Sequence, residues 1–337
     1  MRLSVIIPVY NGRRFLGQIL QALVSSSRAP DEILVVDDGS TDGSGTLARA
    51  WGARVFTQAD GPQGPARARN LGAAQAMGDV LVFLDADVVV HPDALARIAA
   101  HFQEQPDLAA LFGSYDADPP APGHVSRFKN LLHHFTHQHS QREASTFWVG
   151  CGAIRREVFG ALGGFFEGYG RPAVADIELG LRLRQAGRRI LLDPAIQVTH
   201  LKAWTFRSLV KADIFDRAVP WTRLILKQRR LPATLNIDFA SRLGALLAWT
   251  ELALLAVGFW RPEAWVGFIL ALMLQGLLNY RLYQLFFRKG GVRFLGAAVG
   301  LHHLYLLYSS LTFVVVAGQE FSKNYLAGFW GCPRSYH

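Results

Sequence analysis

Short apolar runs recur through the first half of the chain, and polar residues follow each of them. The three clearest runs cover residues 3–7, 33–36 and 80–84, and they are rich in valine, isoleucine and leucine. Runs of this length, ended by proline or aspartate, predict strands of a parallel sheet that is buried on both faces. Helices are expected between them, for example at about 14–25. This alternation predicts an α/β domain with a mostly parallel sheet, whose ligands bind beyond the carboxyl ends of the strands.

Two later stretches combine apolar with basic residues. Between residues 119 and 145, apolar positions from Phe128 to Phe135 recur at the spacing of one helical face, and the remaining positions are largely basic. A second stretch, 204–226, mixes tryptophan and phenylalanine with arginine and lysine. Both patterns are typical of amphipathic helices that lie at a membrane surface.

Three long apolar segments follow, at about Phe239–Trp260, Ala264–Phe287 and Phe294–Gly318. Each is close to the ~20 residues that a helix needs to cross a bilayer. We therefore expect three transmembrane helices, or two if the first helix is interfacial. The predicted organisation is a catalytic domain over 1–202, interface helices over 203–235 and an all-α transmembrane region over 236–337.

The charges around these segments indicate their orientation. Basic residues precede the first segment and separate the second from the third: Lys227, Arg229, Arg230, Arg242, Arg288, Lys289 and Arg293. By the positive-inside rule both groups are cytoplasmic, which places the catalytic domain on the cytoplasmic side of an inner membrane. Glu251 lies inside the first segment, where a charge needs a partner. Gln275 and Arg281 are the candidates.

Composition narrows the functional classes. The chain has 337 residues, 50% of them hydrophobic, and a formal net charge of +9. Such a charge suits nucleic acid, anionic lipid or a phosphate-rich substrate. Because the basic residues crowd around the apolar segments, we expect a membrane and no nucleic acid. Two cysteines give no disulfide framework, and the apolar run before Pro8 is too short for a signal peptide.

The sequence Asp85-Ala86-Asp87 follows the third predicted strand. Two carboxylates separated by one residue can share a hard divalent cation that also contacts substrate phosphates. Such a cation can neutralise a diphosphate leaving group. Taken alone, the triplet is more typical of a turn with a helix cap than of a metal site.

Four motifs occur in order along the chain: VIIPVYN at 5–11, VVDDGSTD at 35–42, ARNLG at 68–72 and FLDAD at 83–87. Together they resemble the family-2 inverting glycosyltransferases, which have a Rossmann-like GT-A fold, and the resemblance covers about residues 3–205. A dinucleotide-binding domain would instead need G-x-G-x-x-G after the first strand, which this chain lacks.

The resemblance implies a site for a nucleotide-sugar donor, such as a UDP- or GDP-sugar. The positions that would line it are Pro8, Tyr10, Asn11, Asp37, Asp38, Arg67, Arg69, Asn70 and Asp85. It also implies a Mg²⁺ or Mn²⁺ ion held by Asp85, Asp87 and His200. Two alternatives stay open: the arginines are solvated helix residues, and Asp37 is a helix cap.

The resemblance also implies an acceptor side. Residues 150–157 and 162–165 match the acceptor loop and the turn after it, and Asp176 matches the catalytic base, with Glu178 as a second candidate. The family commonly has Glu-Asp where this chain has Ala175-Asp176. The two acids are alternatively helix N-terminal charges that the helix dipole favours.

A lipid or lipid-linked acceptor is expected from the membrane segments. One alternative is transfer to a polyprenyl phosphate, which needs no base, and another is an inactive membrane scaffold. The cluster His133, His134, His137 and His139 includes an i, i+4 pair without acidic partners, and we interpret it as surface residues. His200 is alternatively a structural histidine.

Overall fold

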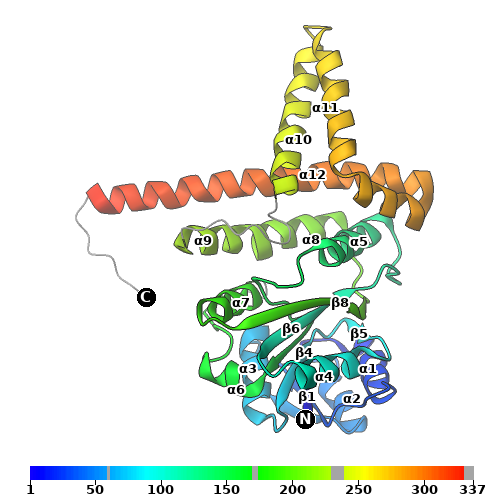
Figure 1. Cartoon of the computed structure of the whole chain (residues 1–337), viewed down its shortest axis with the longest axis vertical. Coiled ribbons are helices and arrows are strands. Elements are labelled where there is room, and N and C mark those ends of the chain that lie inside the picture. Colours follow the sequence, from blue (N-terminus) through cyan, green and yellow to red (C-terminus); the bar gives the residue numbers. More distant parts are fainter. Residues whose placement is uncertain (59–60, 169–173, 229–238, 330–337) are drawn as a thin grey trace. The chain divides into compact units, whose positions relative to one another are not determined.

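A computed structural model describes residues 1–58, 61–168, 174–228 and 239–329. The chain divides into two compact units, Met1–Trp204 and Thr205–His337. Figure 1 names the elements of both units along the chain.

The first unit contains a single eight-stranded sheet with the order β3-β2-β1-β4-β7-β6-β8-β5. Its strands are β1 (Leu3–Val9), β2 (Glu32–Asp37), β3 (Arg54–Thr57), β4 (Val80–Leu84), β5 (Val88–Val90), β6 (Leu108–Tyr115), β7 (Cys151–Arg155) and β8 (Arg189–His200). Strands β3, β2, β1 and β4 are parallel neighbours, as the apolar runs predict. The other half is mixed, because β7 runs antiparallel to β4 and β6, and β5 antiparallel to β8.

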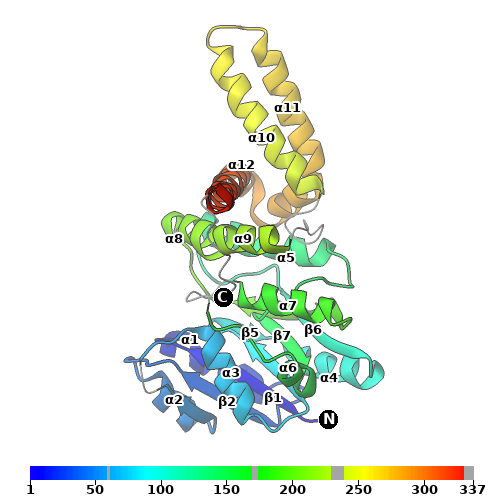
Figure 2. The same cartoon turned by 90° about the vertical axis from the view of Figure 1, so that its left-hand side faces the viewer.

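Helices cover both faces of this sheet (Figures 1 and 2). They are α1 (Arg13–Val24), α2 (Ser44–Ala50), α3 (Pro65–Gln75), α4 (Ala94–Glu104), α5 (His124–His139), α6 (Arg156–Ala161) and α7 (Ala175–Gln185). One core contains Val5 and Ile7 with residues of α1 and α4, and the other contains Ile6 with residues of α3, α6 and α7. The alternation follows from the two-residue period of a strand. The α/β fold class is therefore confirmed.

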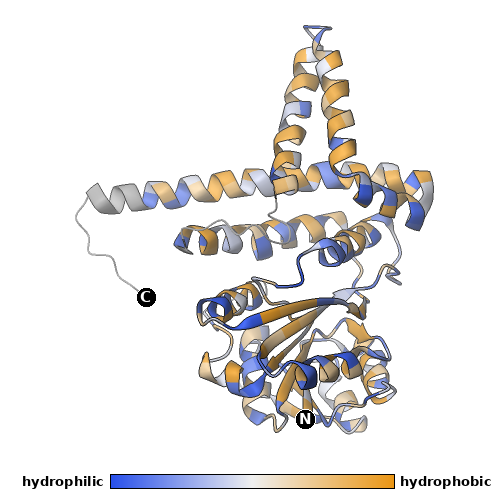
Figure 3. Ribbon diagram, viewed as in Figure 1, coloured by the Kyte–Doolittle hydropathy of each residue, from blue (hydrophilic) through white to orange (hydrophobic). Residues whose placement is uncertain are grey.

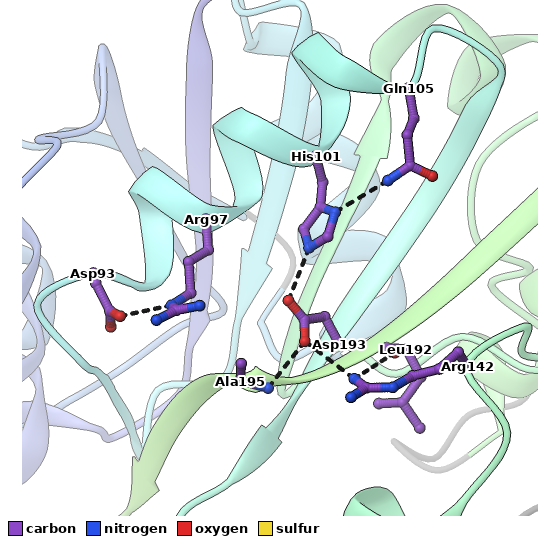
Figure 4. Close-up of polar contacts among 8 residues, drawn as sticks. All are labelled: Asp93, Arg97, His101, Gln105, Arg142, Leu192, Asp193 and Ala195. Carbon is purple, nitrogen blue, oxygen red and sulfur yellow. Dashed lines mark hydrogen bonds and ion pairs between the residues drawn. The ribbon is translucent and has the colours of Figure 1, made fainter.

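A polar network joins α4 to β8 beside the core (Figure 4). His101 of α4 lies 2.8 Å from the Asp193 carboxylate of β8, and Arg142 donates to the same carboxylate at 3.2 Å. Burial alone would raise the pKa of Asp193, but these contacts hold it below its usual value. The network fixes one end of β8, the strand that ends at His200.

The second unit is helical. It contains α8 (Phe206–Lys211), the π-helix η1 (Ala212–Ala218), α9 (Val219–Gln228), α10 (Phe239–Gly258), α11 (Ala264–Leu278) and α12 (Tyr280–Phe329). Two helices among the described residues are long and apolar enough to cross a membrane, Phe239–Gly258 and Tyr280–Lys323. Figure 3 shows their hydrophobic colouring.

Two expectations for this unit need correction. The second apolar segment is not one helix, because α11 ends at Leu278 and α12 begins at Tyr280. The partner of Glu251 is neither Gln275 nor Arg281. His303 of α12 lies 3.0 Å from the Glu251 carboxylate, while the side-chain amide of Gln275 is buried without a hydrogen bond.

Candidate active site

The carboxyl ends of β1, β2 and β4 meet at one edge of the sheet, because these strands are parallel neighbours. Pro8 lies in β1, opposite Val36 of β2. Asn11 has a φ of 51°, and it binds the loop after β2 through Ser40 Oγ and Thr41 N, both at 2.9 Å. Tyr10 beside it is 56% exposed, so its ring is free to stack on a planar ligand.

The two aspartates at the end of β2 are buried and hold backbone turns. Asp37 accepts a hydrogen bond from Ser40 N at 2.8 Å within the turn after β2, and it is not a helix cap, because α2 begins at Ser44 with Gly43 at its N-cap. Asp38 accepts from the backbone of Gln63 and Gly64 at 2.7 and 2.8 Å. Both carboxylates therefore shape the edge of the site, and direct contact with a nucleotide stays a prediction.

Arg69 and Asp85 form an ion pair between α3 and the end of β4. Arg69 is 4% exposed, and its Nη2 lies 2.6 Å from Asp85 Oδ1. The arginine is thus not a solvated helix residue. Within the part of the chain that the structure describes, no group of three or more aspartate, glutamate, histidine or cysteine side chains is placed to hold a metal ion, and a metal contact of Asp85 together with Asp87 and His200 stays a prediction.

Asp176 lies at the start of α7, close enough to this ion pair to sense both charges. Its Oδ1 accepts from Ile177 N at 2.8 Å and its Oδ2 from Val149 N at 3.4 Å. Burial raises the pKa of Asp176 to about 6, although the charge of Arg69 and these hydrogen bonds pull it down. A carboxyl group with this pKa is a suitable general base near neutral pH.

Asp87 and His200 come together where β5 pairs with the end of β8. His200 Nε2 lies 3.6 Å from Asp87 Oδ2, and the imidazole stacks on the Tyr115 ring with centroids 4.5 Å apart. Burial alone would raise the pKa of Asp87, but the neighbouring His200, with the charge of Lys202, keeps it below its usual value. Asp87 is thus an ionised carboxylate beside an imidazole, and their role as metal ligands stays a prediction.

A second polar cluster lies on the other side of the same strands. Asp116 Oδ2 lies 3.0 Å from His91 Nε2 and accepts a short hydrogen bond from the Thr199 hydroxyl. Thr199 and His200 are neighbours in β8, so their side chains point to opposite faces. The Asp116 cluster therefore ties together the chain segments that carry Asp87 and His200.

Sequence analysis missed an aromatic group next to this pair. Trp148 packs edge-on against Tyr115 and His137, with centroids 4.9 Å apart in each case. His137 is 3% exposed, so the surface interpretation of the histidine cluster is wrong for this residue. The available signal was Gly150, where a Cβ would lie 2.1 Å from the Trp148 indole. Only glycine leaves room for the ring.

Two expected site residues support a turn instead. The Asn70 side chain donates to Phe165 O at 2.8 Å and accepts from Phe165 N at 2.9 Å. Glu178 binds Arg182 through two contacts of 2.7 Å, and Arg182 holds carbonyl groups of the same turn. Asn70 and Glu178 therefore help to hold this turn, and their expected roles as a nucleotide ligand and as a base stay predictions.

Arg67 lies on the exposed side of α3, where its Nη1 donates to Gln63 Oε1 at 3.0 Å. It is not part of the Arg69 ion pair. Its expected contact with a diphosphate stays a prediction.

Comparisons with known proteins agree with this geometry. Residues 4–163 match the family model described as "Glycosyl transferase family 2". Glycosyltransferase GlyG of Streptococcus pneumoniae serotype 4 is 30% identical over 118 residues, which cover 34% of this chain and 38% of that protein. Validoxylamine A glucosyltransferase of Streptomyces hygroscopicus subsp. limoneus is 29% identical over 220 residues, 55% of this chain and 48% of that protein. The chain thus spans less than half of each.

One solved structure matches along most of the chain. It is the mannosyltransferase PcManGT of Pyrobaculum calidifontis, in complex with GDP-Man and Mn²⁺. The match has a TM-score of 0.54 at 19% identity and covers 98% of this chain and 88% of that one. At this identity the match shows a shared fold.

Proposed function

We propose that the chain transfers a sugar from a nucleotide diphosphate donor to a hydroxyl group of a lipid or lipid-linked acceptor. The match of residues 4–163 to the family-2 glycosyltransferase model supports this proposal. The anomeric configuration is inverted in a single displacement. The acceptor oxygen bonds to the anomeric carbon while the bond from that carbon to the diphosphate oxygen breaks.

The donor nucleotide binds at the edge formed by β1 and β2 in this proposal. Tyr10 is exposed enough to stack on the base, and Asp38 and Asn11 fix the loops around it. PcManGT was solved with GDP-Man, which supports a nucleotide-sugar donor of the UDP or GDP type. Arg69 lies beneath this edge and supports Asp85.

The residues present fit a divalent cation. Among the described residues, no group of three or more histidine, cysteine, aspartate or glutamate side chains is placed to hold one. Asp87 and His200 would hold it as a pair, and donor phosphate oxygens and water would complete its coordination. One carboxylate and one imidazole suit Mn²⁺ better than Mg²⁺. When bound, the cation neutralises charge on the departing diphosphate.

The position and the raised pKa of Asp176 are the observations that support the proposal most directly. A carboxylate beside the Arg69–Asp85 pair, with a pKa of about 6, is ionised at neutral pH yet basic enough to accept a proton. It would take the proton of the acceptor hydroxyl as the new bond forms. General-base catalysis of this kind contributes about 10²- to 10⁴-fold.

The second unit supports a membrane-bound acceptor. It contains two helices long and apolar enough to cross a bilayer, and basic residues flank them. We propose that these helices anchor the protein in the cytoplasmic membrane with the catalytic unit on the cytoplasmic side. An anchored enzyme meets a lipid acceptor at a raised effective concentration.

The test is nucleotide release by the purified, detergent-solubilised chain. UDP- and GDP-sugars are offered with Mn²⁺, Mg²⁺ or EDTA, together with a lipid extract or a purified polyprenyl phosphate. Asp176→Asn is compared with Glu178→Gln, since Glu178 is engaged by Arg182. We expect metal-dependent release with the extract and a loss of roughly 100-fold or more for Asp176→Asn. Nucleotide release by Glu178→Gln should stay close to that of the unchanged protein.

Two other outcomes reject the proposal in different ways. Release that needs polyprenyl phosphate and survives Asp176→Asn would identify a phosphate acceptor, which requires no base. Absence of release with every donor and both acceptor preparations would favour the scaffold alternative.

A further inference from the structure

Helix α12 is unusual for a membrane span because three different surfaces run along it. The helix covers Tyr280–Phe329, with a break at Gly291 where φ is 68°. At 100° of rotation per residue, each residue after this break can be assigned to one side of the helix. A broad side, about 120° wide from Tyr308 to Glu320, packs on η1 and α9. A second side packs on α10, and a narrow third side is open.

The first side binds the amphipathic helices. Tyr308 donates a hydrogen bond to Asp213 of η1 at 2.7 Å, and Arg223 of α9 lies 3.3 Å from Glu320. The earlier residue of each element pairs with the earlier residue of the other, and the later with the later. Helix α12 and the segment η1–α9 therefore run in the same direction for several turns. The segment η1–α9 carries Arg217, Arg223 and Lys227. A helix with such residues lies at the surface of a bilayer.

The second side meets α10. Trp249 donates to Ser310 Oγ at 2.9 Å, and His303 lies 3.0 Å from Glu251. In both views the α10–α11 hairpin stands crosswise to α12 (Figures 1 and 2). A crosswise arrangement means that α12 and the hairpin cannot both be perpendicular to the plane of a membrane.

The third side is apolar and exposed. Leu304, Leu311 and Val315 lie within about 40° of each other around the helix. They are 45%, 49% and 47% exposed. Val314 and Phe321 lie about 80° and 100° from Leu304 around the helix, toward the side that meets α10, and they are 65% and 73% exposed. The third side, which we call the open stripe, lies between the side that meets α10 and the side that binds η1–α9.

We propose that α12 from Leu304 to Phe321 lies in the plane of the membrane and does not cross it, with the open stripe against the hydrocarbon of the bilayer. The α10–α11 hairpin is then the element that enters the bilayer. The inference rests on the membrane attachment proposed above, and it replaces the third expected span by an interfacial helix.

Two observations favour the hydrocarbon of the bilayer as the partner of the open stripe. The hairpin has exposed apolar residues as well, since Leu252 and Leu270 are 45% and 60% exposed. The charge of Glu251 is met by His303 at the level where α10 passes α12, so an in-plane α12 keeps this pair close to the membrane surface. A buried charge deep in the bilayer would cost at least a few kcal/mol.

The distribution of basic residues along the second unit agrees with an in-plane α12. A hairpin returns to the side on which it began, so the basic residues before α10 and those at 288–293 share one side. With α12 in plane, Lys323 stays on that side as well. A third crossing would move Lys323 to the other side.

Depth-dependent fluorescence quenching tests the proposal on the full chain. Single cysteines replace Leu304, Leu311, Val315 or Phe321 of α12, and Leu252 or Leu270 of the hairpin, and each carries an environment-sensitive fluorophore. Cys332 is replaced by serine. Cys151 is kept, because it is buried and burial raises the pKa of its thiol to about 12, so it does not react. Met77→Cys in the catalytic unit is the water-exposed control.

Vesicles of phosphatidylcholine and phosphatidylglycerol contain lipids with a nitroxide either near the headgroup or deep in the acyl chain. We expect the probes at Leu304, Leu311 and Val315 to lose fluorescence mainly to the shallow nitroxide, and by the same ratio of shallow to deep quenching. The probe at Phe321, which lies to one side of the stripe, should also lose fluorescence mainly to the shallow nitroxide. The hairpin probes should lose more to the deep nitroxide. The Met77 probe should lose to neither.

Three results would overturn the in-plane helix. A ratio that changes steadily along the ~26 Å from Leu304 to Phe321 would mean that α12 crosses the bilayer. Protection from both nitroxides, with disulfide formation between Leu311→Cys chains, would mean that a second copy covers the stripe. If the hairpin probes are also not quenched, the proposed membrane attachment is wrong. The assay of nucleotide release in detergent does not depend on this attachment, so it still tests the proposed function.

Discussion

Asp176 combines a useful pKa with a cost to stability. Its pKa is raised by burial from 3.8 to about 6. Below pH 3.8 the folded and unfolded states both hold the proton, and nothing is lost. As the pH rises through 6 the folded state must hold a partly desolvated carboxylate, so this group favours folding at low pH and opposes it at neutral pH.

Asp176→Asn is therefore expected to inactivate the enzyme and stabilise it. At pH 8 the gain in the free energy of unfolding should be about 1 to 3 kcal/mol, allowing for solvent screening. It should shrink as the pH falls through 6 and vanish near pH 4. The measurement is the unfolding temperature of both proteins from pH 4 to 8. A gain that does not change with pH would show that Asp176 is not the titrating group.

The Asp116 cluster predicts a role for a residue that touches no substrate. Asp116 binds His91 and Thr199 behind Asp87 and His200. Asp116→Asn should weaken Mn²⁺ binding in the presence of a nucleoside diphosphate about tenfold, as loss of a supporting contact commonly does. Titration calorimetry measures this without turnover. Asp193→Asn is the matched control, because Asp193 also pairs with a histidine but lies seven residues before His200 in β8.

The candidate site was only partly predictable residue by residue. The types and order of Asp85, Asp87 and Asp176 were visible, because motifs preserve spacing. The residues that they contact were not visible in the sequence. Whether Asp85 faces Arg69 or a metal depends on side-chain directions across two elements, and the sequence carries no local signal for that choice. For Trp148 the nearby Gly150 was a local signal, but its partners Tyr115 and His137 belong to other elements and were not predictable.

At the scale of elements, α3 is positioned by one close approach to the sheet. A Cβ at Gly72 would lie 2.6 Å from Ile6 Cγ2 and 3.1 Å from Val36 Cγ2. This contact seats the helix that carries Arg69 on β1 and β2. Only a residue without a side chain permits that distance.

Gly72→Ala should consequently destabilise the protein by about 1 to 3 kcal/mol, the range for overpacking a core. Gly160→Ala in α6 is the control, since nothing lies within 4 Å of its added methyl group. Alanine should be neutral or slightly stabilising there, because it favours helix more than glycine does. Thermal unfolding of both variants provides the comparison. Equal shifts in the two would contradict the packing argument.

The elements of the sheet differ in how well the sequence predicts them. Strands β1, β2 and β4 are continuous apolar runs, since helices cover both of their faces. Strand β8 alternates buried and less buried residues instead, and β7 is inserted antiparallel between β4 and β6. Such a pairing joins segments far apart in the chain, so a local pattern of hydrophobicity does not reveal it.

For the whole molecule, the division into two units predicts that the catalytic unit folds by itself. The unit Met1–Trp204 contains two apolar cores of its own and all residues of the candidate site. It should therefore fold without the helical unit. Among the described residues, both helices that are long and apolar enough to cross a membrane belong to the second unit.

A fragment ending at Trp204 should thus bind a nucleoside diphosphate and Mn²⁺ as tightly as the full chain. Its transfer to a lipid in vesicles should fall by roughly 10²- to 10⁴-fold, because acceptor and enzyme no longer share a surface that raises their effective concentration. Calorimetry measures the first quantity and nucleotide release the second. Undiminished transfer by the fragment would locate acceptor recognition entirely in the catalytic unit. The helical unit would then need another role, since an anchor that leaves the rate unchanged does not deliver the substrate.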